Sequence, residues 1–195
     1  LEKTTKFYQA NLLANRQALN YIVRKRGFNK QTLIDFRLGY SPNNGAALVK
    51  FLTKEDYSIK EISMAGLTSQ RRVGLGDMFR GRIMIPLADQ FGKTIGFTAR
   101  ILEDNPNAPK YINTPSTPLY DKSRHVYGLH LAKKAIQASK FSVLAEGNLD
   151  VISSHQAGVK NVVATAGTAL TLAQLKTLGR FSPDVRLAFD EDRAG

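Results

Sequence analysis

The sequence predicts an α/β fold that ends in a parallel β-α-β-α-β unit. Three short apolar runs, at residues 141–145, 161–165 and 184–189, are separated by two segments that are each long enough for a helix. Continuous apolar runs of this length are typical of strands that are buried on both faces of a parallel sheet. Because the crossovers in such sheets are right-handed, the three strands point the same way and their carboxyl ends share one edge.

Carboxylates follow two of these strands. Glu146 comes directly after the first strand, and Asp190 and Asp192 come after the third. Oxygen ligands gathered at one sheet edge favour Mg²⁺ or Mn²⁺ over zinc, and the chain has no Cys that would favour zinc. Asp190 and Asp192 could instead cap a helix that begins at Arg193, because Asp is favoured in a first helical turn. Both interpretations remain open at this point.

The charge is distributed unevenly along the chain. Residues 1–140 hold 23 Lys or Arg against 10 Asp or Glu, whereas residues 141–195 hold 5 against 6. A basic first part beside acidic strand ends predicts binding of a polyanion in one part and of metal in the other. Excess Lys and Arg can also be a surface that favours solubility. The sequence has no apolar run long enough to cross a membrane, and the absence of Cys is typical of a cytoplasmic protein.

Helices dominate the start of the chain. Apolar spacing predicts a helix from Leu1 to Arg26 that stops at Gly27, and a short helix over residues 30–36. Further helices are expected over residues 45–52 and after Ser58. Ser58 and Glu61 have the spacing of a capping box, in which each side chain bonds the other residue's backbone N–H. Residues 68–80 show no regular spacing of apolar residues and are expected to form a loop.

A hairpin and an irregular segment complete the first part. Residues 82–88 and 94–102 are β-type runs around a Gly-bearing turn, and Pro86 implies an edge position or a bulge. Arg100 lies inside the second run, where a lone Arg usually points to solvent. Residues 109–124 carry Lys, Arg, Tyr and Asn among prolines, a mixture that suits a nucleic-acid or triphosphate surface. A helix to about Ser139 then joins the two parts.

Several motifs resemble those of a known family. Glu146-Gly-Asn-Leu-Asp150 and the segment 189–195 are similar to the two acidic signatures of the Toprim fold. The blocks at 81–89, 92–100, 109–118 and 122–128 resemble, in the same order, blocks of bacterial DnaG-type DNA primases. The resemblance covers nearly the whole chain.

This resemblance implies a fold, an activity and a set of site residues. The implied architecture is a mixed α+β basic subdomain (1–127), a linking helix (128–140) and a partial Toprim subdomain (141–195). The implied activity is template-directed synthesis of short RNA primers on single-stranded DNA for replication, with ribonucleoside triphosphates as substrates. The metal-binding and catalytic residues would be Glu146, Asp190 and Asp192. The residues that bind nucleic acid or nucleotide would be Arg26, Arg100, Lys110, Tyr111, Asn113 and Lys122.

The chain departs from the family pattern in a few places. Glu191 stands where the family usually has Gly, and the acids that complete the metal site lie downstream of Gly195 in the family. The zinc-binding module and the C-terminal module that binds the replicative helicase also lie outside the chain. We therefore expect a partial polymerase core that binds template but makes no detectable primer by itself.

Two other functions share these features, namely another Toprim enzyme (a nuclease or a topoisomerase) and a nucleic-acid-binding domain without activity. Asp150 is expected either to contact the metal ligands or to lie at a helix start, rather than to bind the metal itself. The three histidines, His125, His130 and His155, lack the spacing of a metal site and are expected to be structural or on the surface.

Overall fold

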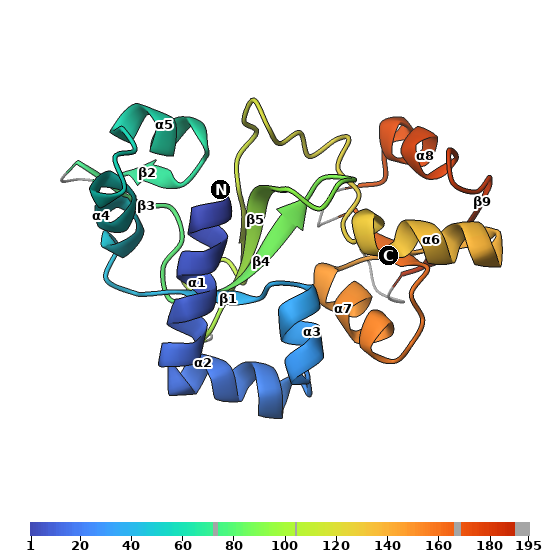
Figure 1. Cartoon of the computed structure of the whole chain (residues 1–195), viewed down its shortest axis with the longest axis horizontal. Helices are drawn as coiled ribbons and strands as arrows, with labels where there is room; N and C mark the ends of the chain where they lie inside the picture. The colour runs from blue at the N-terminus through green and yellow to red at the C-terminus, as the bar shows by residue number, and fades with distance from the viewer. Residues whose placement is uncertain (72–73, 104, 166–168, 190–195) are drawn as a thin grey trace. The chain divides into compact units, whose positions relative to one another are not determined.

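A computed structural model describes residues 1–71, 74–103, 105–165 and 169–189 of the chain (Figure 1). The chain divides into two compact units. The first unit comprises Leu1–Pro86 and Thr94–Tyr120, and the second comprises Leu87–Lys93 and Asp121–Gly195. The domain boundaries at residues 127 and 141 stay predictions. No helix in the described ranges has the length and the apolar character that crossing a membrane requires.

The first unit begins with three helical segments where the sequence predicts one helix. These are α1 (Glu2–Ala14), α2 (Arg16–Asn20) and the π-helix η1 (Tyr21–Lys25). The prediction of one helix is wrong because Asn15 has extended backbone angles, and its side chain accepts a hydrogen bond from the Ala18 N–H at 2.9 Å. Asn is a preferred residue for such a cap, so a new helix begins there.

The other predicted helices of the first unit are confirmed, with small shifts at their ends. They are α3 (Lys30–Asp35), α4 (Ala47–Lys54) and α5 (Ile59–Met64). Both bonds of the capping box between Ser58 and Glu61 are present at the start of α5. Gly66 follows α5 with φ of +71°, a left-handed conformation that favours glycine after a helix.

A four-stranded sheet lies at the centre of the first unit. Its order is β1-β4-β5-β6, formed by β1 (Gly39–Ser41), β4 (Arg82–Ala88), β5 (Thr94–Ile101) and β6 (Tyr111–Asn113). The predicted hairpin is confirmed as β4 and β5. Strand β6 lies within the segment that the sequence predicts to be irregular, where it pairs antiparallel with β5.

Pro86 does not lie in an edge strand, because β4 runs between β1 and β5. Strand β1 pairs only with residues 82–84 of β4. Pro86 therefore follows the part of β4 that is paired with β1, and its missing N–H costs no ladder bond on that side.

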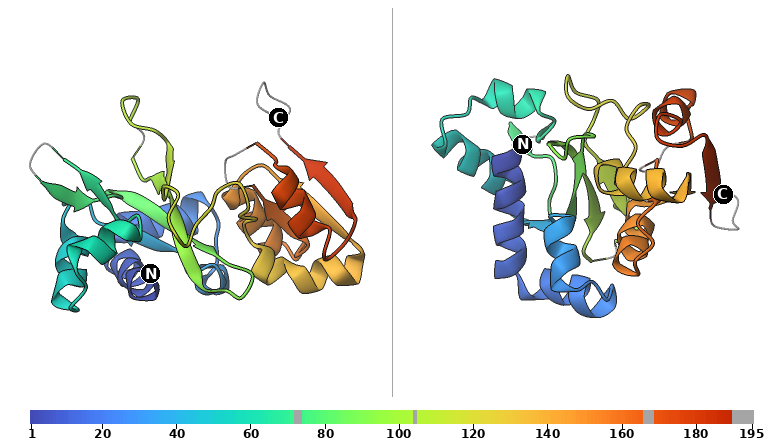
Figure 2. Two further views of the ribbon diagram at one scale, coloured as in Figure 1. Left: turned by 90° about the horizontal axis from the view of Figure 1, so that it is seen from above. Right: turned by 45° about the vertical axis from the view of Figure 1, so that its right-hand side comes forward.

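The loop predicted at residues 68–80 contains a second, two-stranded sheet. Strands β2 (Thr68–Gln70) and β3 (Leu75–Asp77) pair antiparallel. The hairpin contacts α4 and α5, and these elements gather at one end of the first unit (Figures 1 and 2). The prediction of a loop is wrong because the strands are short and polar, so that apolar alternation is not visible in the sequence.

Helix α1 packs tightly against β1 in the first unit (Figure 1). A Cβ atom added at Gly39 would lie 2.5 Å from the Cβ atom of Tyr8, so only glycine fits where the helix crosses the strand. The surrounding core consists of Tyr8, Leu48, Leu52, Ile62, Leu67, Phe79, Met84, Phe97 and Ala99.

The second unit contains the predicted parallel sheet. Strand β7 (Phe141–Ala145) pairs in parallel with β8 (Val162–Ala164) on one side and with β9 (Asp184–Ala188) on the other. The helices are α6 (Leu129–Ser139), α7 (Asn148–Gln156) and α8 (Leu172–Leu178). The prediction of three parallel strands with helical crossovers is therefore confirmed, and β9 lies at an edge of the sheet (Figure 2).

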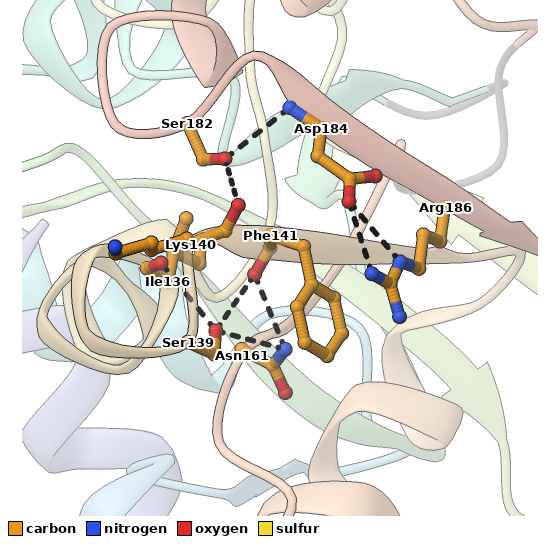
Figure 3. A network of polar contacts seen from close by, with 8 residues as sticks. All are labelled: Ile136, Ser139, Lys140, Phe141, Asn161, Ser182, Asp184 and Arg186. Atoms are coloured by element: carbon orange, nitrogen blue, oxygen red, sulfur yellow. Dashed lines mark hydrogen bonds and ion pairs between the residues drawn. The ribbon is translucent and has the colours of Figure 1, made fainter.

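A polar network fixes the amino ends of β7 and β9 (Figure 3). Ser182 Oγ donates to the carbonyl of Lys140 at 2.5 Å and accepts from the backbone N–H of Asp184 at 3.2 Å. On the other side of β7, Asn161 Nδ2 donates to the carbonyl of Phe141 at 3.2 Å. The Arg186 guanidinium lies 3.8 Å from the centre of the Phe141 ring. These contacts set the register in which Ala145 and Ala188 stand side by side at the carboxyl ends.

Candidate nucleic-acid interface and metal site

Three of the predicted nucleic-acid residues meet around Tyr21 in the first unit. Arg26 Nε donates a hydrogen bond to the Tyr21 hydroxyl at 2.7 Å. The Arg100 guanidinium lies 4.9 Å from the centre of the Tyr21 ring. Tyr111 stands opposite Arg100 in the pairing of β5 with β6. We call Tyr21, Arg26, Arg100 and Tyr111 the Tyr21 cluster.

Arg100 does not point to solvent. The residue is only 4% exposed, and its Nη1 donates to the carbonyl of Ile101 at 2.8 Å. A largely buried guanidinium is costly unless its donors are used, and its contact with an aromatic face offsets part of that cost. Arg100 is thus fixed in place and does not follow the usual tendency of a lone strand Arg to point to solvent.

Tyr111 presents the exposed aromatic surface of this cluster, since 43% of the residue is accessible. Partial burial raises the pKa of the Tyr111 phenol, although the nearby charges of Arg100 and Arg26 act in the opposite direction. The phenol therefore stays protonated at neutral pH. It can donate a hydrogen bond while its ring offers a stacking face to a base.

The remaining predicted residues lie nearby in sequence but differ in environment. Asn113 Oδ1 accepts a hydrogen bond from Thr98 Oγ1, further along the pairing of β5 with β6. Lys110 is exposed, and its carbonyl accepts from Arg82 Nη1 at 3.3 Å. Lys122 is half-buried in the second unit, where its carbonyl accepts from Gln174 Nε2 at 3.3 Å.

A pocket of about 890 Å³ lies in the first unit, and the sequence did not predict it. Three arginines line it, namely Arg71, Arg80 and Arg82. Asn43, Asn105 and Asn107 add amide groups, and Glu103 is the one carboxylate among its described lining residues. Burial lowers the pKa of Arg82, whose guanidinium also bonds the carbonyl of Ala99. The three cations and the amides make this cationic pocket suited to an anionic ligand.

The acidic sheet edge is described at Glu146 only, because Asp190 and Asp192 lie outside the described residues. Glu146 directly follows β7, next to the strand pair that ends at Ala145 and Ala188. Its Oε2 atom is buried and accepts no hydrogen bond within the described part of the chain. The same is true of Asn148 Oδ1 at the start of α7, which the sequence did not indicate.

Buried acceptor oxygens without a donor fit a site for a hard cation, because a cation supplies the missing partner. Among the described residues, no three His, Cys, Asp or Glu side chains gather in a way that would hold a metal ion. Glu146 therefore fits one ligand of a Mg²⁺ or Mn²⁺ site whose other predicted ligands are Asp190 and Asp192.

Asp150 and His155 make structural contacts, and His125 is buried. Asp150 Oδ2 accepts from the Gly147 N–H at 3.0 Å, so the acid stabilises the start of α7 as expected. His155 Nε2 bonds the carbonyl of Val162 at 2.9 Å. Burial lowers the pKa of His125 to about 4, helped by His130 and opposed by Asp89.

Comparison with known proteins identifies the class and then the family. A family model described as Toprim-like matches residues 143–195, which places the second unit in the Toprim class. A second model, described as the DNA primase catalytic core, N-terminal domain, matches residues 7–133. The chain belongs to the family of DnaG-type DNA primase catalytic cores. The predicted family and the predicted fold class are therefore confirmed.

Individual relatives agree with this result. The chain is 40% identical over 196 residues to a DNA primase of Synechocystis sp., covering 97% of this chain and 31% of the relative. It is 38% identical to a DNA primase of Aquifex aeolicus, covering 100% of this chain and 39% of the relative. The chain thus spans roughly a third of these relatives.

Solved structures of primases have the same fold. The RNA polymerase domain of Mycobacterium tuberculosis primase DnaG superimposes with a TM-score of 0.91 at 33% identity, covering 99% of this chain and 65% of that one. A DnaG primase catalytic domain bound to ssDNA has a TM-score of 0.88 at 30% identity, covering 100% of this chain and 61% of that one.

Proposed function

We propose that the chain is part of the catalytic core of a DNA primase, which copies single-stranded DNA into short RNA primers from ribonucleoside triphosphates. The observation that carries the proposal is the Tyr21 cluster in a chain of the primase family. Arg26 and Arg100 present positive charge beside the exposed ring of Tyr111. Cations and an aromatic face together are what a single strand or a nucleotide requires.

Each predicted residue has a role in this proposal. Arg26, Arg100, Lys110 and Lys122 neutralise phosphates, Tyr111 stacks on a base, and Asn113 offers an amide for a hydrogen bond. The cationic pocket is proposed as a second surface for an anionic ligand, and Arg80 is an exposed cation of that pocket. A relative bound to ssDNA supports a single-stranded template as the ligand. A replicative helicase is the proposed partner through a module outside this chain, and the cytoplasm is the proposed location.

The chemistry depends on the acids of the second unit. Glu146, Asp190 and Asp192 are proposed to hold Mg²⁺ or Mn²⁺, which neutralises charge on the transferred phosphoryl group when it is bound. The protein's own part is to hold these carboxylates at the strand ends and to orient template and nucleotide. The buried, unbonded Oε2 of Glu146 supports this assignment within the described residues.

The test is binding of a fluorescein-labelled single-stranded DNA, followed by anisotropy at several salt concentrations. A variant with Arg100→Ala, Lys110→Ala and Lys122→Ala should bind more weakly for every sequence. The dependence of log Kd on log salt should fall by about 0.7 for each phosphate that the variant no longer neutralises. Arg80→Ala tests the cationic pocket in the same way.

A matched control removes the same charge elsewhere. Lys6, Lys54 and Lys60 are exposed in α1, α4 and α5, so their triple Ala variant should retain most of the affinity. Far-UV circular dichroism should confirm that the triple variant at Arg100, Lys110 and Lys122 folds. Binding of the first triple variant as tightly as wild type at low salt would show that the interface is elsewhere.

A further inference from the structure

Tyr21 is absent from the residues that the sequence predicted, yet it lies at the centre of the Tyr21 cluster. We infer that Tyr21 is a positioning residue, which acts on nucleic acid through Arg26 and Arg100. The inference rests on the proposed function, because it assumes that these two arginines contact phosphate. It assigns to Tyr21 the task of fixing where the two guanidinium groups point.

The contacts of Tyr21 are polar as well as aromatic. Its hydroxyl accepts the Arg26 Nε–H at 2.7 Å, and the Arg26 guanidinium also lies 5.4 Å from the ring centre. Arg100 lies 4.9 Å from the same ring, and Lys25 Nζ lies 5.6 Å from it. The buried Tyr21 ring is thus in contact with three cations. Lys25 and Arg26 lie at the end of η1, and Arg100 lies in strand β5.

Tyr21 differs from Tyr111 in its exposure. Tyr21 is 8% exposed, whereas Tyr111 is 43% exposed. A ring that is buried under guanidinium groups has no free face for a base. Tyr21 therefore acts on the arginines, and Tyr111 is the ring that remains available for stacking.

The local backbone explains how Arg26 reaches Tyr21. The Arg26 N–H donates to the carbonyl of Tyr21 at 3.0 Å, which is the bond that closes a π-turn across five residues. In an α-helix of about 3.6 residues per turn, residues five apart lie on different faces. The wider π-turn brings Arg26 back over Tyr21. Such turns are found frequently at functional sites.

Positioning is needed because like charges repel and arginine side chains are long. Lys25, Arg26 and Arg100 would move apart in the absence of an anion. The negative face of the Tyr21 ring attracts the cations, and the hydroxyl fixes the direction of one guanidinium. An interface held in this way before binding loses less side-chain entropy when phosphate arrives.

The test uses two substitutions at Tyr21 in the 195-residue chain. Tyr21→Phe keeps the ring but removes the acceptor for Arg26, and Tyr21→Leu removes both. We expect Tyr21→Phe to weaken binding of labelled single-stranded DNA about tenfold, the effect of one hydrogen bond to a charged group. Tyr21→Leu should weaken binding further. Tyr57→Phe is the matched control, because its ring also lies near a cation, Lys3, at 5.5 Å.

Two readouts separate positioning from a general effect on the fold. In an Arg26→Ala background, Tyr21→Phe should change the affinity less than about twofold, because the group that it orients is gone. The NMR resonance of the Arg26 Nε–H should shift in Tyr21→Phe, while the urea midpoint of the chain stays close to that of wild type.

The outcomes also separate this inference from the proposed function. If Arg26→Ala and Arg100→Ala bind like wild type, the proposed interface is wrong, and the role assigned to Tyr21 is overturned with it. If both weaken binding but Tyr21→Phe does not, only the role of Tyr21 is overturned. An equal loss of affinity from Tyr21→Phe with and without Arg26 would also overturn it.

Discussion

The carboxylate of Asp77 caps a helix that begins far earlier in the chain, because its Oδ2 atom accepts the backbone N–H of Leu48 at 2.9 Å. Its other oxygen accepts the Val49 N–H at the same distance. The residue at the N-cap position of α4 is Ala46, which has no side-chain acceptor. Asp77, at the end of β3, therefore satisfies two N–H groups that α4 would otherwise leave without a partner.

Replacement of Asp77 by Ala should destabilise the first unit by about 2 kcal/mol or more. The substitution removes a helix cap and leaves two N–H groups with no acceptor at a site where Asp77 is fully buried. Asp77→Asn keeps one acceptor oxygen and should cost less. The measurement is urea unfolding followed by circular dichroism.

Asp35→Ala is the control for Asp77, since Asp35 is an exposed acid whose side chain accepts from the Gln31 side chain. Its effect should stay within about 0.5 kcal/mol. Equal stability of Asp77→Ala and wild type would show that the cap contributes nothing to the fold.

This cap explains one limit of the sequence-based prediction. The sequence predicts that α4 begins at Gly45, two residues before its observed start, and that residues 68–80 form a loop. Both errors involve Asp77, which caps α4 and ends strand β3 within the segment predicted to be a loop. The acceptor for α4 lies 29 residues away along the chain, so no local pattern could indicate it.

The features of the candidate sites that depend on local sequence motifs were predictable. The parallel pairing of β7, β8 and β9 and the position of Glu146 after β7 followed from apolar runs and right-handed crossovers. Tyr21 and the cationic pocket did not follow. They depend on a π-turn and on side chains from separate elements, which only the folded chain brings together.

The ion pair between Glu2 and Arg37 should make stability depend on pH in the acid range. The Arg37 guanidinium, hydrogen-bonded to Glu2, holds the pKa of Glu2 at about 2, and the Thr94 N–H adds to this effect. The pKa in the folded state is below the unfolded value, so the stabilisation is present above about pH 4.3 and is lost as the pH falls towards about 2. Half of the Glu2 side chain is exposed, so solvent screening reduces the contribution of this ion pair to the free energy of unfolding to about 1 kcal/mol or less.

Glu2→Gln should therefore lower the free energy of unfolding at pH 7, and the difference from wild type should shrink as the pH falls below about 4. Urea unfolding of the variant and of wild type at a series of pH values measures this difference in the free energy of unfolding. In an Arg37→Gln background, Glu2→Gln should have a much smaller effect. A difference that stays constant from pH 7 down to about pH 2 would contradict the role of this pair.

Glu146→Gln should weaken Mn²⁺ binding measured by calorimetry, because the neutral amide removes the charge of a proposed ligand while keeping its shape. The affinity of the wild-type chain is expected to be modest, with three proposed carboxylates and water completing the shell. Asp184→Asn is the matched control, since Asp184 is an exposed acid of the same sheet that lies at the amino end of β9 (Figure 3). That variant should bind Mn²⁺ like wild type. Unchanged Mn²⁺ affinity in Glu146→Gln would remove Glu146 from the metal site, and an equal loss in both variants would indicate a general effect of charge.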